Sequence, residues 1–209
     1  MKHFDQQAKE WDNDPKKTER AITIAKEMTD FIQPTRTMNA FEFGCGTGLL
    51  SYQLKDSFKT ITPADTSEGM INVLKEKIAD ENINNFKPLL VDLLEDGFAI
   101  KKNEFDVIYT FMTLHHILEV DKILAIFNAM LKTGGYLCIA DLVKEDGSFH
   151  NNVPGFDGHN GFDRSTLSAV LSNHGFKVAY NEIPLEIEKE FDKKVRKYPV
   201  FLMICKKIN

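Results

Sequence analysis

The stretch that constrains the fold most is residues 39–51, Asn-Ala-Phe-Glu-Phe-Gly-Cys-Gly-Thr-Gly-Leu-Leu-Ser. It begins with a short apolar run, which predicts a buried β-strand. Three glycines follow at alternate positions, Gly44, Gly46 and Gly48, and a helical pattern begins at Leu49. This order is typical of a ligand site in an open α/β sheet, because glycines admit a ligand close to the backbone and a helix N-terminus offers unpaired N–H groups.

The spacing of the glycines and an acid beside them narrow the choice of ligand. A dinucleotide fingerprint is G-x-G-x-x-G, and its third glycine would fall on Leu49. The chain has G-x-G-x-G instead, with Glu42 inside the strand. A carboxylate at that place suits a cationic or hydrogen-bond-donating ligand better than a pyrophosphate. The alternative is a tight strand–helix turn that binds nothing.

Residues 42–48, Glu-Phe-Gly-Cys-Gly-Thr-Gly, resemble motif I of the class I methyltransferases that depend on S-adenosylmethionine (SAM). SAM carries an ammonium, a sulfonium and a ribose, and no phosphate. The resemblance implies that this segment binds SAM and that S-adenosylhomocysteine is the product. The residues to which it assigns cofactor binding here are Glu42, Gly44, Cys45, Gly46 and Gly48.

Size and composition favour a globular chain in a reducing compartment. The 209 residues are 43% hydrophobic, enough for a sizeable core. A net charge of −5 does not favour a nucleic-acid partner, although a local basic patch stays possible. The three cysteines are scattered, no apolar run approaches the length of a membrane span, and the N-terminus lacks an apolar leader core. We therefore expect a cytoplasmic protein with no membrane contact.

The N-terminal part predicts two helices ahead of the sheet. Phe4, Ala8 and Trp11 have helical spacing, and a second helical pattern starts at Asp14-Pro15 and ends before Pro34. We expect residues 1–36 to form a helical cap or flap and residues 37–209 to form the SAM-binding domain. Phe4 and Trp11 either pack against that domain or close over the ligand and contact the substrate.

The rest of the chain alternates between strand and helix patterns. Further strands are expected at residues 59–65, 86–91, 105–110 and 136–142, with helices between them, and a glycine pair at 134–135 is expected to break the last of these helices. Residues 143–163 are polar and loop-like. Two final runs, 176–188 and 199–206, joined by a charged segment, predict an antiparallel edge hairpin.

This order resembles the class I methyltransferase fold. The prediction is an α/β protein with a Rossmann-like doubly wound sheet. It has seven strands, mostly parallel, with an antiparallel C-terminal edge hairpin and with N-terminal helices in addition.

Acids at strand ends extend the cofactor prediction. Asp65 ends the second strand, where a carboxylate can accept both ribose hydroxyls. By resemblance, Asp92 accepts a hydrogen bond from the adenine amino group, and the backbone N–H of Leu93 donates to a ring nitrogen of adenine. The alternative for Asp65 is an acid at the start of a helix, and the alternative for Asp92 is an acid in a turn. The resemblance also places four other residues around the cofactor, Thr66 and Met70 at the adenosine and Thr110 and Phe111 at the methionine part.

The fourth strand leads into Thr-Phe-Met-Thr-Leu-His-His, residues 110–116. This segment resembles motif IV of the family in the Leu-His-His-Ile form of small-molecule methyltransferases, such as those of quinone biosynthesis. His115 or His116 is the candidate general base, because imidazole titrates near neutral pH. The alternative is that one histidine satisfies backbone groups and the other is buried. We expect no metal, because adjacent histidines converge poorly on one ion and no acid or cysteine cluster accompanies them.

Two further residues are weaker candidates. His159 lies in a loop of glycines and aromatics, residues 155–162, that either shapes the acceptor pocket or is ordinary loop chemistry. Arg20 either meets the carboxylate of the methionine part of SAM or is a solvated surface residue. The predicted substrate contacts are Phe4, Trp11, His115 and His159.

The sequence therefore predicts a SAM-dependent methyltransferase that attacks the sulfonium methyl with an O, N, S or C atom of a small molecule. One alternative is a nicotinamide-dependent oxidoreductase, disfavoured by Leu49 and Glu42. Others are a non-catalytic SAM-binding protein and a nucleic-acid methyltransferase. The last is disfavoured because no Asn/Asp-Pro-Pro-Tyr/Phe follows the fourth strand.

Overall fold

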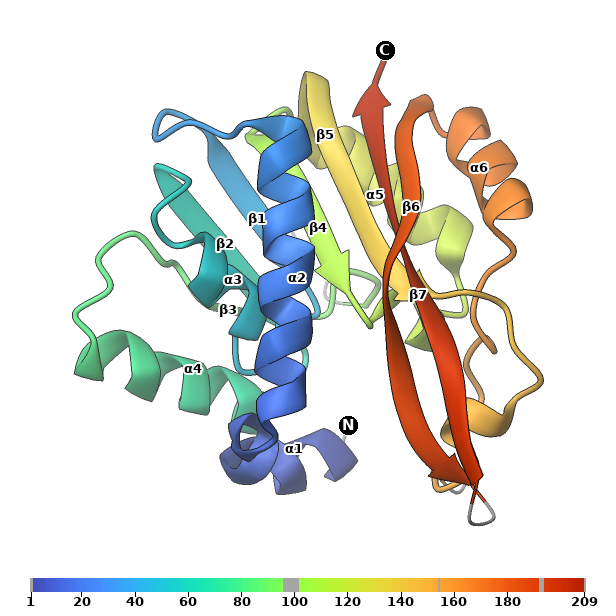
Figure 1. Ribbon diagram of the computed structural model, residues 1–209. Helices are drawn as coiled ribbons and strands as arrows, with labels where there is room; N and C mark the ends of the chain where they lie inside the picture. Colours follow the sequence, from blue (N-terminus) through green and yellow to red (C-terminus); the bar gives the residue numbers. More distant parts are fainter. Residues whose placement is uncertain (1, 96–101, 154, 192–193, 209) are drawn as a thin grey trace.

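The computed structural model describes residues 2–95, 102–153, 155–191 and 194–208. They form a seven-stranded sheet in the order β3-β2-β1-β4-β5-β7-β6 (Figure 1). Strands β1 to β5 pair in parallel, and β7 is antiparallel to both β5 and β6. The strands are β1 Asn39–Phe43, β2 Thr60–Asp65, β3 Leu89–Leu90, β4 Phe105–Phe111, β5 Leu131–Leu142, β6 Phe176–Phe191 and β7 Lys194–Lys207. The predicted fold class is confirmed.

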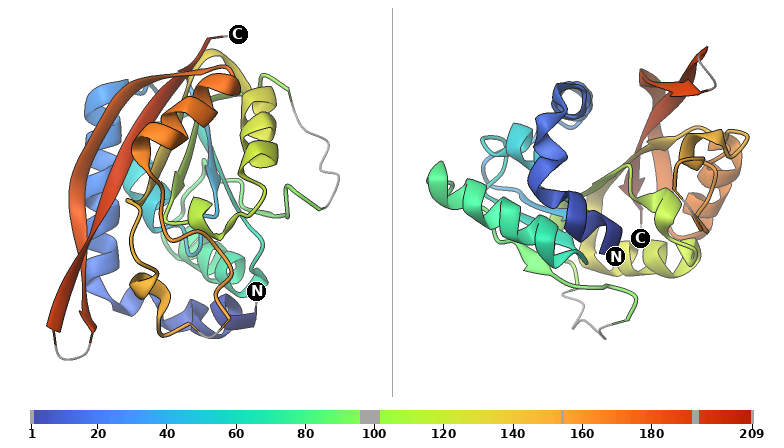
Figure 2. Two further views of the ribbon diagram at one scale, coloured as in Figure 1. Left: turned by 90° about the vertical axis from the view of Figure 1, so that its right-hand side faces the viewer. Right: turned by 90° about the horizontal axis from the view of Figure 1, so that it is seen from below.

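Helices cover both faces of the sheet because each central strand is apolar on both sides. In β1, Phe41 and Phe43 pack on one face with α5 (Val120–Met130) and α6 (Arg164–Asn173). Ala40 packs on the opposite face. That face is covered by α2 (Pro15–Ile32), α3 (Leu49–Leu54) and α4 (Glu68–Asp80) (Figure 2).

Two strand boundaries differ from the sequence prediction for backbone reasons. The third strand was expected at residues 86–91, but the ladder covers only Leu89–Leu90 because Pro88 has no N–H to donate. Before it, Phe86 makes a single bridge to Ile61. The glycine pair at 134–135 was expected to end the preceding helix, yet α5 ends earlier, at Met130, and β5 already begins at Leu131. A Cβ on Gly135 would lie 2.8 Å from the Asp106 carbonyl oxygen, so glycine permits this close pairing.

The C-terminal hairpin is longer than predicted. Its pairing continues through the charged segment that was expected to join the strands, as far as Phe191 opposite Lys194. This two-stranded ribbon extends beyond the sheet (Figure 1), where both of its faces can carry charged side chains. Lys197 forms ion pairs with Glu186 at 3.0 Å and Glu188 at 3.8 Å. Residues 192 and 193 of the charged segment lie outside the described residues.

The N-terminal helix prediction needs one adjustment. The first segment is a short α-helix, α1 (Lys2–Gln7), followed by a 3-10 helix, η1 (Ala8–Asn13). The Asp14 side chain then accepts the backbone N–H of Lys16 and caps α2, as the Asp-Pro pair predicts. Two further 3-10 helices, η2 (Leu114–His116) and η3 (Ser148–His150), follow β4 and β5.

The carboxyl ends of the parallel strands meet at one edge of the sheet, the place where open α/β sheets bind ligands. The glycine turn, η2 and η3 follow strands at this edge, and α1 and η1 lie against it (Figures 1 and 2). Among the described residues, none of the helices combines the length and the apolar character that crossing a bilayer requires.

Candidate active site

The glycine turn after β1 requires glycine for two reasons. Gly44, Gly46 and Gly48 have φ of 68°, 53° and 76°, in the region that glycine adopts without strain. The side chain of Thr113 also leaves no room for a side chain at position 44, because a Cβ on Gly44 would lie 2.1 Å from Thr113 Cγ2. The Thr113 hydroxyl donates to the Gly44 carbonyl at 3.1 Å. The turn is therefore tied to the segment after β4 that leads into the two histidines.

Glu42 lies beneath this turn and is 2% exposed. Its carboxylate accepts a hydrogen bond from the Ser51 hydroxyl, which lies 2.8 Å from the Tyr109 hydroxyl. Burial raises the pKa of Glu42 to about 8, although the bonds to Ser51 act in the opposite direction. The carboxyl group is thus a buried support of the turn, and its predicted contact with the cofactor stays a prediction.

Asp65 lies at the end of β2 beside the turn. Its two oxygens accept backbone N–H groups, one from Gly46 at 2.7 Å and one from Ser67 at 2.8 Å. Burial raises the pKa of Asp65, and these backbone hydrogen bonds oppose that rise. A carboxylate has about four acceptor sites, so ribose hydroxyls can still be accepted.

The other predicted cofactor residues surround the same edge. Met70 is buried, and its sulfur lies 3.9 Å from where a Cβ on Gly46 would be. Asp92 accepts the Leu94 N–H at 2.9 Å, which fixes the turn after β3. Leu93 is buried, Phe111 is partly buried and Thr66 is exposed. Thr110 is buried with a hydroxyl that has no hydrogen-bond partner among the described residues.

The N-terminal segment, residues 2–13, is fastened over the glycine turn. Asp12 accepts the Thr47 hydroxyl at 2.5 Å and the Lys77 ammonium at 2.6 Å. The Trp11 Nε1 lies 3.9 Å from where a Cβ on Gly46 would be. Phe4 continues the cover, with its ring centroid 5.9 Å from that of Trp11.

The same segment also reaches the histidines and α4. The Phe4 ring meets the His116 ring edge-on at 5.6 Å. Asp5 accepts the Ser67 hydroxyl at 2.6 Å and the Gly69 N–H at 2.9 Å. Phe4 and Trp11 therefore lie between the predicted cofactor site and the predicted acceptor site.

His115 is held by an acid that sequence reasoning missed. Its Nδ1 lies 2.6 Å from Asp141 Oδ1, and its backbone N–H donates to Asp141 Oδ2 at 3.2 Å. Both side chains are buried, at 1% and 0% exposure. Because the carboxylate accepts, Nδ1 carries the proton and Nε2 keeps a lone pair.

Two more histidines, His116 and His150, lie beside His115. We call these three residues the histidine cluster. The His150 ring lies 5.0 Å from the His115 ring and stacks on Phe156 at 3.7 Å. Burial, followed by the charge of His115, lowers the pKa of His150 to about 3. His116 is the most exposed of the three. Partial burial of its ring, followed by the charge of His115, lowers the pKa of His116 to about 4. Both rings are therefore neutral at physiological pH.

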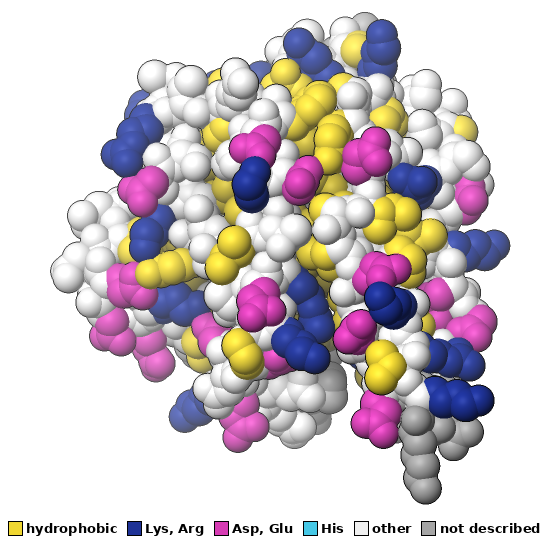
Figure 3. Space-filling model, in the orientation of Figure 1, with side chains coloured by type: hydrophobic (Ala, Val, Ile, Leu, Met, Phe, Trp, Pro, Cys, Tyr) yellow, Lys and Arg dark blue, Asp and Glu magenta, His cyan; other side chains and the backbone are white. Residues whose placement is uncertain are grey.

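His159 and Arg20 lie away from this cluster. His159 Nε2 lies 3.0 Å from the Ile117 carbonyl, and its backbone N–H donates to the His115 carbonyl at 2.7 Å. Arg20 is partly exposed on α2, and its charge helps lower the pKa of Lys189, after burial. Figure 3 shows basic side chains in the hollow between α2 and the hairpin. Positive charge therefore gathers there although the whole chain is acidic.

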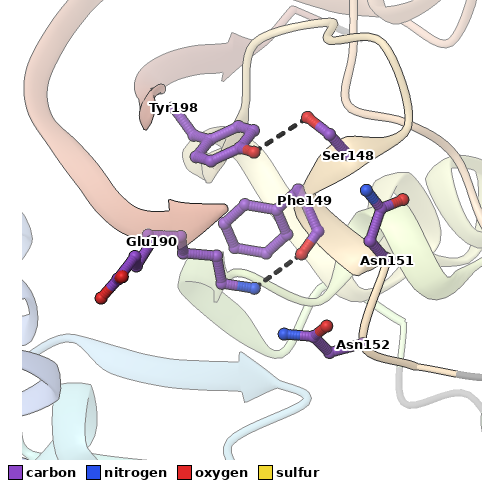
Figure 4. A pocket seen from close by; sticks show the side chains of 7 residues that line it. Ser148, Phe149, Asn151, Asn152, Glu190 and Tyr198 are labelled. Carbon is purple, nitrogen blue, oxygen red and sulfur yellow. Dashed lines mark hydrogen bonds between the residues drawn. The ribbon is translucent and has the colours of Figure 1, made fainter. Parts of the chain in front are cut away.

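Two surface hollows flank η3. One, of about 230 Å³, is lined by Ser148, Phe149, Asn151, Asn152, Lys189, Glu190 and Tyr198 (Figure 4). There the Lys189 ammonium donates to the Phe149 carbonyl at 2.6 Å. The other, of about 380 Å³, is lined in part by His150 and Phe156, so the cluster borders a space open to solvent.

Sequence analysis did not single out Asp141 or His150, and only the tertiary structure shows that they lie beside His115. Asp141 lies near the end of β5, so the argument that singled out Asp65 and Asp92 also applies to it. His150 lies in the loop after β5, and nothing in its sequence spacing connects it to the histidine pair.

Comparison with known proteins identifies the family. Residues 17–181 match the model of the methyltransferase domain. The chain belongs to this methyltransferase family. It is 31% identical over 148 residues to an uncharacterized methyltransferase of Schizosaccharomyces pombe, covering 65% of this chain and 52% of that protein. The chain thus spans about half the length of this curated relative.

Solved methyltransferase structures share the fold. One is the putative methyltransferase in complex with the Haloferax volcanii Trm112 activator, with a TM-score of 0.80, 15% identity and coverage of 99% and 98% of the two chains. Another is Haemonchus contortus phosphoethanolamine N-methyltransferase 2 with S-adenosylhomocysteine, at a TM-score of 0.69, 14% identity and coverage of 87% and 51%. The prediction that the chain belongs to a methyltransferase family is confirmed by the family model, and the solved structures share its fold.

The buried carboxyl group of this methyltransferase yields a pH prediction. Because the folded-state pKa of Glu42, about 8, exceeds its usual 4.5, folding takes up a proton between these values. The stabilising contribution of Glu42 is full below pH 4.5 and is lost as pH rises toward 8. The free energy of unfolding should fall by at most about 1.4 kcal/mol per pH unit in this interval.

Glu42→Gln should remove this slope, because a neutral amide keeps an acceptor for Ser51 without titrating. Urea unfolding at several pH values from 5 to 8 measures it, with Glu19→Gln on the exposed face of α2 as the control. Parallel curves for the wild type and Glu42→Gln would contradict the assignment.

Proposed function

We propose that this domain transfers the methyl group of SAM to a hydroxyl group of a small molecule. The observation that carries the proposal is the Asp141–His115 pair, which Thr113 and Gly44 link to the glycine turn. A buried histidine held by a carboxylate is an arrangement suited to removing a proton. A hydroxyl acceptor needs such help because its usual pKa is far above neutral.

The cofactor lies, in this proposal, across the glycine turn with its ribose at Asp65 and its adenine near Asp92 and Leu93. The methionine part then extends toward Thr110, whose buried hydroxyl has no partner among the described residues. A ligand that accepts or donates a hydrogen bond there would satisfy it. Glu42 supports this arrangement from below through Ser51.

The acceptor enters, in the same proposal, between the cofactor and the histidine cluster. His115 Nε2 takes the hydroxyl proton, and Asp141 stabilises the imidazolium that forms. The acceptor oxygen attacks the methyl carbon as the methyl–sulfur bond breaks, and the electron pair of that bond stays on sulfur. Catalysis then comes mainly from positioning, because the sulfonium is already reactive.

The size and charge of the site support a small acceptor. Residues 2–13 cover the edge with Phe4 and Trp11, which leaves little room for a polymer. The basic side chains between α2 and the hairpin favour an acceptor with an anionic group (Figure 3). We also place the protein in the cytoplasm, since its three cysteines are free and buried. Screening hydroxyl, amine and thiol compounds for release of S-adenosylhomocysteine tests the proposed acceptor class. Turnover confined to amines or thiols would contradict it.

Asp65→Ala should weaken SAM binding by about 1–3 kcal/mol, which is about 5- to 150-fold, because ribose hydroxyls would lose their acceptor. Isothermal titration calorimetry with SAM measures the change. Asp80→Ala, at the exposed end of α4, is the control and should bind as the wild type does. Unchanged affinity in Asp65→Ala would remove the ribose assignment.

Deleting residues 1–13 should lower turnover by about 10-fold or more while SAM affinity changes less, if these residues close the site during the reaction. The deletion keeps Asp14, the cap of α2, and so leaves the helix start intact. Turnover and SAM titration on the same preparation separate the two effects. Equal turnover would make the segment a packing element only.

Asp141→Asn should lower kcat by about 10²–10⁴-fold with little change in SAM affinity, because His115 would lose its orientation and the charge that stabilises its protonated form. Steady-state kinetics with an accepted hydroxyl compound and SAM titration of the same preparation measure the two effects. A kcat equal to that of the wild type would contradict the role of Asp141.

A further inference from the structure

The histidine cluster joins residues from two separate loops at one point. His115 and His116 follow β4, and His150 belongs to η3 after β5. One ring nitrogen of each lies within 4.8 Å of those of the other two. Neighbouring histidines were not expected to converge, yet the rings of His115 and His116 lie 4.2 Å apart, tilted by 40°.

One ring nitrogen in the histidine cluster has no hydrogen-bond partner among the described residues. His150 is 8% exposed, and its Nδ1 is buried with no hydrogen-bond partner among the described residues. Buried polar atoms nearly always have a partner, so an orphan of this kind indicates a missing ligand or ion.

We infer that His115, His116 and His150 bind one divalent transition-metal ion, with Zn²⁺ as the best match. Neutral imidazole is a favoured ligand of zinc. Three histidines leave the fourth tetrahedral position open, as in catalytic rather than structural zinc sites. Zinc binds imidazole at about 2.0–2.1 Å, which puts ligand nitrogens about 3.4 Å apart, so the rings need only small rotations to close.

The residues around the histidine cluster hold its rings in defined orientations, as metal ligands require. Asp141 holds Nδ1 of His115 and leaves Nε2 for the metal, the carboxylate–histidine arrangement found behind many zinc ligands. Phe156 stacks on His150 with an interplanar angle of 7° and so fixes the plane of that ring. His116 is the exposed member of the cluster, and its ring lies edge-on to Phe4 and Phe156 with centroids at 5.6 and 5.5 Å.

A metal at this place would deepen the proposed function, on which its catalytic role rests. The open position would bind the acceptor oxygen and lower the pKa of its hydroxyl. The proton would then pass to solvent water instead of to His115, and the oxygen would attack the SAM methyl as before. His115 and its two partners would act as ligands.

The test measures metal binding directly and does not depend on methyl transfer. Chelator-treated, dialysed protein is titrated with Co²⁺, whose visible absorption reports tetrahedral nitrogen ligands, and Zn²⁺ then displaces it. The wild type should bind one equivalent. His150→Phe keeps a ring against Phe156 but removes both nitrogens, and it should bind Co²⁺ about 100-fold more weakly or not at all.

Two controls separate metal binding from folding and from the proposed function. His174→Gln, at the end of α6 and paired with Asp121, should bind metal as the wild type does. SAM affinity, measured on every sample, should be unchanged in both variants. A wild type that binds neither metal, or a His150→Phe variant that binds it equally well, would overturn the inference. Metal binding without methyl transfer would leave the site standing and remove the proposed function instead.

Discussion

The contact between the glycine turn and the segment after β4 holds the two halves of the site together. Gly44 has no side chain, so Thr113 can occupy the space where a Cβ would be and donate to the Gly44 carbonyl. This brings the strand that starts the cofactor site next to the strand that delivers the histidines. The separation between the predicted cofactor site and the histidines is therefore set by backbone packing rather than by flexible side chains.

The two halves differ in their chemistry because their surroundings differ. The half that is predicted to bind the cofactor is built from backbone N–H groups, glycines and carboxylates, which suit a polar ligand with a ribose. The histidine half is a packed group of aromatic rings in which burial favours the neutral form. Neutral imidazole can accept a proton or bind a metal, so His115 can be the base of the proposed function or, with His116 and His150, a ligand of the proposed metal site.

The N-terminal segment connects these halves from outside. Asp12 fastens it to the cofactor side through Thr47 and Lys77, and Phe4 places it against His116. Short polar contacts of this kind can break and form again far more easily than core packing. The segment therefore has the character of a cover over the site, while α2 behind it buries Ile24 and Met28 in the core under the sheet.

The sequence by itself determined the sheet and its class, because those depend on local patterns, and from the same patterns it predicted the edge that binds the cofactor. Strand–helix alternation, the glycine turn and the cap residue Asp14 all act within a few positions of the chain. The predicted strand boundaries were wrong where pairing with a neighbouring strand sets them, as at Pro88, at Gly135 and along the charged hairpin. Only the tertiary structure brought Asp141 and His150 to His115. Asp141 lies in β5, His150 in η3 and His115 in η2, and no local spacing encodes how this strand and these two loops come together.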